Sequence, residues 1–138
     1  MTIAPLSARS VADAMHEGVL TCAPETPLRD VARMLARHRV HALVVGDGAR
    51  ALGVVSDVDV LDALAHDALA DATAGAGARS PLVVARRSDP LRLVARRLRE
   101  AGATHAVVVD GERPVGVLST LDLARAVAAE PDLGEIDT

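Results

Sequence analysis

The architecture of this chain follows from one stretch, Gly53-Val54-Val55-Ser56-Asp57-Val58-Asp59, which occurs twice. The second copy is Gly116-Val117-Leu118-Ser119-Thr120-Leu121-Asp122, at an offset of 63 residues (116 − 53). Upstream, PLRDVARML at residues 27–35 matches PLRLVARRL at residues 90–98 with the same offset. Because chance does not keep one offset over separated blocks, the sequence indicates an internal duplication.

A third matching block lies between these two. HALVV at residues 41–45 resembles HAVVV at residues 105–109, at an offset of 64 residues (105 − 41). We therefore predict that the first copy is one residue shorter, at the helix–strand junction around Arg39. On this alignment His41 and His105 occupy equivalent positions.

Each copy predicts the element order helix, strand, helix, strand, strand, helix. Apolar residues at helical spacing indicate a helix that begins near Pro27, with its arginines on the opposite, solvated face. Two apolar runs, residues 42–45 and 51–55, flank Gly46-Asp47-Gly48, which is typical of a β-hairpin. A further helix is predicted to begin at Ser56.

The duplication also predicts how the chain is divided. We expect a first unit at residues 9–68, a second unit at residues 69–129, and flexible tails at residues 1–8 and 130–138. A unit of about 60 residues buries too little apolar surface to be stable alone. The two units should therefore pack sheet against sheet about a pseudo-twofold axis, leaving two equivalent clefts. The predicted fold class is α/β (α+β).

Composition excludes several classes of function. The chain has a net charge of −4 and contains no Phe, Tyr or Trp, so it lacks the basic surface and the stacking platforms of nucleic-acid binders. Any bound base would have to lie between aliphatic side chains. The single cysteine, Cys22, cannot form a disulfide within the chain and is best explained as a small apolar strand residue.

The predicted location of the protein rests on the length of its apolar runs and on the residues that interrupt them. No apolar stretch reaches the roughly 18 residues needed to cross a bilayer. Pro5, Arg9 and Asp13 interrupt the apolar residues at the start, so we expect no secretory signal. The predicted location is cytoplasmic, with neither membrane nor nucleic acid among the partners.

The repeated Ser-x-x-Asp motif has two explanations. Ser56 with Asp59, and Ser119 with Asp122, are spaced for a capping box at a helix start, and from physics alone this explanation comes first. The same place suits a phosphorylated ligand, because a helix N-terminus offers free N–H groups to phosphate. The carboxylate could accept hydrogen bonds from two ribose hydroxyls. One motif could serve both purposes.

The element order, the duplication and the repeated Gly-x-x-Ser-x-x-Asp pattern resemble a CBS-domain pair, also called a Bateman module, over roughly residues 9–129. The resemblance implies a regulatory module for an adenosine ligand (AMP, ADP, ATP or S-adenosylmethionine), with Ser56, Asp59, Ser119 and Asp122 binding ribose and phosphates. It also implies adenine pockets at the first two strands of each unit, residues 19–22 with 41–43 and residues 82–84 with 105–107. Further binding candidates there are Thr21, His41, Ala42, Val83, His105 and Ala106. A valine at position 20 is not counted among the binding residues. The two histidines either donate to phosphate or are strand-edge residues without a ligand.

Three classes of function compete: a nucleotide-sensing module, a ligand-free interaction or dimerisation module whose motifs are only helix caps, and an enzyme. No base is placed beside an exposed nucleophile, there is no Gly-x-Ser-x-Gly motif, and the five histidines lack zinc-ligand spacing. We therefore predict no catalytic residue, no metal and no obligatory cofactor. The resemblance implies a homodimer that acts through a downstream partner protein.

Overall fold

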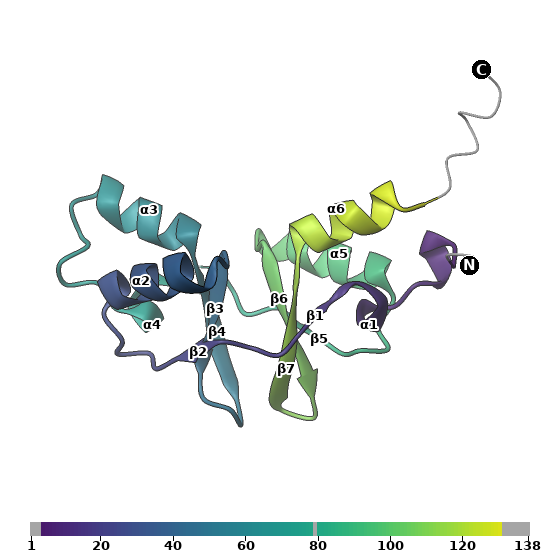
Figure 1. Ribbon diagram of the computed structural model, residues 1–138, viewed down its shortest axis with the longest axis horizontal. Coiled ribbons are helices and arrows are strands. Elements are labelled where there is room, and N and C mark those ends of the chain that lie inside the picture. The colour runs from purple at the N-terminus through teal and green to yellow at the C-terminus, as the bar shows by residue number, and fades with distance from the viewer. Residues whose placement is uncertain (1–3, 79, 131–138) are drawn as a thin grey trace, which may run out of the picture.

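The computed structural model describes residues 4–78 and 80–130, which form two units of sheet and helix side by side (Figure 1). The first half of the chain contains η1 (Leu6–Ala8), α1 (Val11–Ala14), β1 (His16–Glu17), β2 (Thr21–Cys22), α2 (Leu28–His38), β3 (Ala42–Gly46), β4 (Ala51–Ser56) and α3 (Asp57–Ala65). The second half contains α4 (Ala74–Gly77), β5 (Val84–Ala85), α5 (Leu91–Ala101), β6 (His105–Asp110), β7 (Arg113–Ser119) and α6 (Thr120–Ala128). Both halves follow the predicted order, and the first adds η1 and β1.

Two sheets meet at the centre of the molecule (Figure 1). One has the strand order β2-β3-β4 and the other β1-β7-β6-β5. Strand β2 runs parallel to β3, and β5 runs parallel to β6, while β4 and β7 complete antiparallel hairpins. Buried residues from both sheets form one apolar cluster, Val44, Ala51, Val107 and Val109. The predicted fold class and the sheet-to-sheet packing are confirmed.

Helices α2 and α5 are built alike because their sequences place apolar residues at the same three positions. Leu28, Val31 and Leu35 of α2 are buried, and the buried residues of α5 are Leu91, Val94 and Leu98. Each helix follows a proline, whose fixed φ suits a helix start. Each ends at a left-handed residue, Arg39 with φ 55° and Gly102 with φ 63°.

The strand pairing shows that the two copies are in register throughout. Ala42 pairs with Ser56 in the first hairpin, and His105 pairs with Ser119 in the second. Because Ser56 and Ser119 are related by the offset of 63, the counterpart of His105 is Ala42. The predicted one-residue difference near Arg39 is therefore absent.

The predicted equivalence of His41 and His105 is wrong for the same reason. The carbonyl of His41 accepts a hydrogen bond from the Asp57 amide, and the carbonyl of Thr104 accepts one from the Thr120 amide. Thr104 is thus the counterpart of His41. The two histidines are adjacent positions of the repeat rather than the same position.

The helix that begins each repeat packs on the other unit. Val11 of α1 is fully buried in the core of the second unit, beside Leu91 and Val94. Ala74 of α4 is fully buried in the core of the first unit, beside Leu28. The predicted boundaries, residues 9–68 and 69–129, follow the sequence repeats, whereas the packed units exchange these two helices.

The predicted flexible tails differ from the structure where they are described. Leu6–Ala8 forms η1, and the Leu6 amide donates a hydrogen bond of 2.6 Å to Oε2 of Glu130. The Arg9 guanidinium, which is 9 % exposed, donates to the Ala126 carbonyl at 2.8 Å and to Glu130 at 3.2 Å. These contacts hold the two ends of the described chain together. The rest of the predicted tails, residues 1–3 and 131–138, lies outside the described residues.

Candidate functional site

The first Ser-x-x-Asp motif lies where β4 ends and α3 begins. Oδ2 of Asp59 accepts hydrogen bonds from the Ser56 amide at 2.8 Å and from the Ser56 hydroxyl at 3.3 Å. Ser56 is buried, whereas Asp59 is partly exposed. The motif therefore caps α3 and still presents part of its carboxylate at the surface.

A small cavity joins this motif to the second unit. Val54, Ser56 and Asp59 line it from the first unit, and the second unit contributes Ser80, Pro81, Ala103, Thr104 and His105. Its volume is about 20 Å³. That volume holds about one water molecule, whereas small-molecule sites span hundreds of cubic ångströms. An adenosine ligand could enter only if the units moved apart here.

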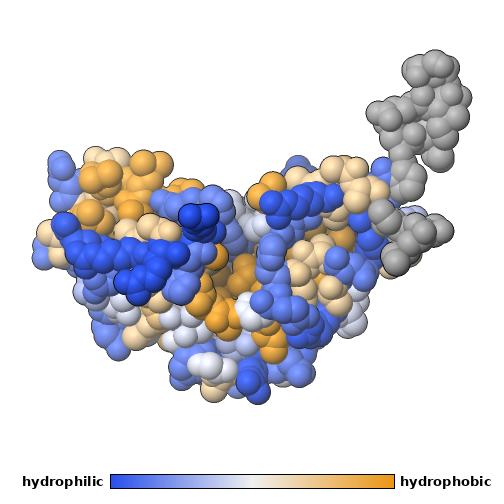
Figure 2. All heavy atoms as spheres, viewed as in Figure 1, coloured by the Kyte–Doolittle hydropathy of each residue, from blue (hydrophilic) through white to orange (hydrophobic). Residues whose placement is uncertain are grey.

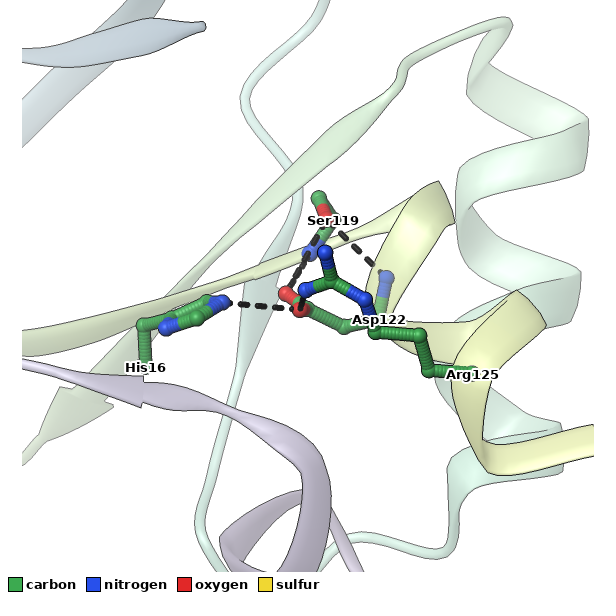
Figure 3. Close-up of polar contacts among 4 residues, drawn as sticks. All are labelled: His16, Ser119, Asp122 and Arg125. Carbon is green, nitrogen blue, oxygen red and sulfur yellow. Dashed lines mark hydrogen bonds and ion pairs between the residues drawn. The ribbon is translucent and has the colours of Figure 1, made fainter. Parts of the chain in front are cut away.

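The second motif, drawn in Figure 3, repeats the hydrogen bonds from serine to Oδ2 of the aspartate, but its aspartate is more buried. Oδ2 of Asp122 accepts from the Ser119 amide at 2.8 Å and from the Ser119 hydroxyl at 3.0 Å. The Asp122 amide donates in return to the Ser119 hydroxyl at 3.1 Å, which completes a reciprocal cap of α6. Asp122 is only 4 % exposed.

The remaining oxygen of Asp122 faces basic side chains from two elements (Figure 3). Nε2 of His16, in β1, lies 2.9 Å from Oδ1, and Nη1 of Arg125, one turn along α6, lies 3.8 Å from it. Both carboxylate oxygens therefore have partners within the protein. Asp122 itself lines the adjoining hollow between α1 and α6, which has a volume of about 300 Å³ and is also lined by Arg9, Asp13, His16 and Arg125 among others.

The two predicted histidines differ in their surroundings. His41 is exposed, and its Nδ1 lies 2.8 Å from Oδ2 of Asp57. His105 is half-buried at the cavity beside Asp59, with its Nδ1 2.8 Å from the Thr104 hydroxyl. Burial lowers the pKa of His105 below its usual value of 6.5, and the opposing influence of nearby carboxylates is smaller.

The other predicted binding residues do not converge on one point. Val83 and Ala106 are buried in the core of the second unit, so their side chains face away from the cavity. Thr21 and Ala42 are partly buried in the first sheet and do not line the cavity. Of the predicted residues, the structure brings together Ser56, Asp59 and His105.

Position 20, just before β2, contributes no binding residue. The sequence has a leucine at this position, Leu20, so the valine named there in the sequence analysis is wrong. The Leu20 carbonyl accepts a hydrogen bond from the Val44 amide at 2.9 Å, and its side chain packs against the core of the first unit. Leu20 does not line the cavity beside Asp59. Its role is therefore to join the first strand to β3.

Sequence reasoning missed Ser80, Thr104 and His16. Ser80 and Thr104 lie just before the segments predicted to line the adenine pocket, so extending those segments by two residues would have included them. His16 has no local signal, because its contact depends on the pairing of β1 with β7 across the duplication.

Neither a metal centre nor a membrane span is found in the part of the chain that the structure describes. Its histidines, cysteines and acidic residues form no group of three that could hold a metal ion. None of its helices combines the length and the apolar composition that crossing a bilayer requires.

Comparison with known proteins identifies the family. The model of the CBS domain matches residues 11–66 and 78–129, which is most of the chain. The chain belongs to the CBS-domain family. The resemblance inferred from the repeated motif is thus confirmed, and the domain occurs here as a tandem pair.

Solved CBS-domain structures share the whole fold. The CBS pair of protein MJ0100, in complex with 5-methylthioadenosine and S-adenosyl-L-methionine, is 21 % identical with a TM-score of 0.78, over 88 % of this chain and 97 % of that one. The CBS-domain protein PAE2072 from Pyrobaculum aerophilum, complexed with AMP, is 28 % identical with a TM-score of 0.73, over 87 % and 99 %. Hypoxic Response Protein I, with two coordinated zinc ions, is 28 % identical with a TM-score of 0.69, over 84 % and 97 %. No curated protein matches the sequence.

Proposed function

We propose that this CBS pair is a regulatory module that binds an adenosine ligand in the first cleft, at Ser56 and Asp59. The observation that carries the proposal is the position of Asp59. It caps α3 through one oxygen while it lines, with His105, a cavity between the two units. A ligand there would contact both units at once.

The residues around this cavity suit the parts of a nucleotide. Among residues 4–78 and 80–130, no hydrogen bond or ion pair involves Oδ1 of Asp59, so that oxygen can accept from ribose hydroxyls. The start of α3 offers amide donors and a partial positive charge to phosphate. The Thr104 hydroxyl and the His105 imidazole lie on the opposite wall. Val54 and Pro81 supply the aliphatic surface that a base would need in a chain without aromatic residues.

The related structures support this class of ligand. PAE2072, which is 28 % identical, was solved with AMP. MJ0100, which shares the fold, was solved with two adenosine compounds. We extend this chemistry to the present chain as an adenosine nucleotide or S-adenosylmethionine, acting as a regulatory ligand rather than a cofactor of catalysis.

The small volume of the cavity determines how a ligand could bind and act. Because it holds about one water molecule, binding requires the two units to separate and close around the ligand. The ligand then favours one relative orientation of the units by its difference in affinity between the two states. A downstream partner protein in the cytoplasm would detect that orientation.

A homodimer would cover the apolar surface of the module. Figure 2 shows apolar side chains gathered over α3, where Val58, Leu61 and Leu64 are 57–64 % exposed. On α6, Leu121 and Val127 are 50 % and 59 % exposed. We propose that α3 of one copy packs against α6 of another.

One observation favours a second candidate function, a ligand-free interaction module. Both motifs already form capping boxes, so the Ser and Asp of each have a structural role without a ligand. In that case the exposed helices α3 and α6 would be the functional surface.

Thermal shift with AMP, ATP and S-adenosylmethionine separates the two candidates. We expect at least one of them to raise the melting temperature of the wild type, and Asp59→Ala to abolish the rise. Asp13→Ala is the matched control, because Ser10 and Asp13 form the same capping box on α1, with the same 2.8 Å and 3.3 Å hydrogen bonds. If no adenosine compound shifts the wild type, the ligand-free module is correct.

A further inference from the structure

A segment of the chain itself lies against the carboxylate of the second motif. We propose that residues 15–18, called the crossing segment below, keep an adenosine ligand away from Asp122 by placing His16 on its free oxygen. The chain then binds one ligand, in the first cleft, and takes a second only when the crossing segment is released. This inference rests on the proposed function, because it concerns the regulation of the same kind of site.

The carboxylate of Asp122 has no acceptor oxygen free for a ribose hydroxyl. Its Oδ2 is used by Ser119, as Oδ2 of Asp59 is used by Ser56. The difference lies at Oδ1, which faces Nε2 of His16 at 2.9 Å. His16 is itself 69 % exposed at its side chain, while that of Asp122 is 3 % exposed, so the imidazole covers the acid from the solvent side.

Three sets of contacts hold the crossing segment in place. His16 and Glu17 pair with Val117 and Gly116 of β7, which makes β1 the edge strand of the second sheet. The Gly18 amide donates to the Val115 carbonyl at 2.8 Å. Arg87 forms a two-point ion pair with Glu17, whose shorter contact joins Nη1 to Oε1 and whose other bond measures 2.8 Å.

The glycine of the second motif is what allows the segment to pass. A Cβ atom at Gly116 would collide with Cε of Met15 and with the carbonyl oxygen of His16. At Gly53, the counterpart in the first motif, the nearest atom of the described residues to such a Cβ is Cβ of Ala78 at 3.9 Å, and Arg79, the counterpart of His16, lies outside the described residues. The absence of a side chain at Gly116 therefore makes room for the crossing segment in the second cleft.

In the first cleft, Oδ1 of Asp59 has no hydrogen-bond partner among the described residues. Asp59 is partly exposed and lines the cavity between the units. The residue at the position of His16 in the second repeat is Arg79, which lies outside the described residues. The proposal therefore concerns Asp122 and His16, and it predicts unequal occupancy of two clefts that carry the same motif.

Calorimetric titration with AMP tests the block directly. We expect the wild type and the control His38→Ala, an exposed histidine at the end of α2, to bind one AMP per chain. His16→Ala should bind two, and His16→Ala with Asp122→Asn should return to one. The inference is overturned if the wild type already fills both clefts, or if His16→Ala still binds one.

A second measurement needs no ligand and keeps the two proposals apart. Hydrogen exchange at the Gly18 amide reports release of the crossing segment, and we expect it to be faster in His16→Ala and in Asp122→Asn than in His38→Ala. Unchanged exchange in both variants would overturn the block. If no variant binds AMP, the proposed function fails, and the exchange result alone then supports or overturns the block.

Discussion

The two clefts of this CBS pair carry the same motif, but the contacts of its aspartate differ between them. In the first, Asp59 caps α3 and borders a cavity that both units line. In the second, Asp122 caps α6 in the same way, but His16 takes its other oxygen and leaves it 4 % exposed. In the second cleft, the contact that decides this comes from outside the motif, from the segment around His16 that pairs with β7.

This comparison separates what the motif does from what its surroundings decide. Capping depends on residues three apart in the chain, so duplication preserves it in both units. Access to the carboxylate depends on segments that pack from the other half, and these have diverged. We therefore propose that the same sequence pattern supports a ligand in one cleft and a structural role in the other.

The largest difference in stability is expected between the two motif glycines. Gly116→Ala should lower the free energy of unfolding by about 1–3 kcal/mol, because the new Cβ collides with the backbone of His16. Gly53→Ala should change it by less than about 1 kcal/mol, because Cβ of Ala78 at 3.9 Å is the nearest atom of the described residues to the new Cβ. Chemical denaturation of both variants measures the contrast. Equal losses would mean that the crossing is no tighter in the second unit.

The second comparison concerns the ends of α2 and α5. Both stop at a left-handed residue, but Arg39 carries a side chain and Gly102 does not. Arg39→Gly should therefore stabilise the protein by about 0.5–1 kcal/mol, and Gly102→Ala should destabilise it by a similar amount. Thermal melts of the two single variants give the signs. Stabilisation by Gly102→Ala would contradict the left-handed conformation at the end of α5.

The smallest effect is a pH dependence from His105, which has alanine as its counterpart in the first unit. Burial lowers its pKa in the folded protein, so the unfolded chain binds the proton more tightly. Stability should fall as the pH drops through 6.5 toward the folded pKa, and the fall should shrink in His105→Gln. The charges that face His105 are Asp57, His41, Asp122 and Asp59. Melting temperatures at several pH values measure the slope, and an unchanged slope in the variant would assign it to another group.

Much of this structure could be predicted from the sequence because its signals are local. Helix α2 follows from an apolar spacing and a preceding proline, and the β3–β4 hairpin from two apolar runs around glycines. The predicted shift between the copies failed for a physical reason. Strands of Ala and Val look alike when moved by one residue, and only the pairing of Ala42 with Ser56 and of His105 with Ser119 fixes the register.

The exchange of α1 and α4 and the position of His16 could not be predicted in the same way. These helices have four residues each and β1 has two, which is too short for a periodic signal. Their places are set by tertiary packing, such as the burial of Val11 beside Leu91. The sequence therefore predicted the two motifs, but it did not predict that His16, from another part of the chain, contacts the second one.

The most direct test of the account is a calorimetric titration of AMP into Asp59→Ala and Asp122→Ala, after thermal melts have shown that both fold. We predict that Asp59→Ala weakens binding by about tenfold or more, as expected for the loss of hydrogen bonds to a charged acceptor. Asp122→Ala should bind AMP as the wild type does, because His16 already occupies that carboxylate. Equal weakening in both variants, or a larger loss in Asp122→Ala, would contradict the account.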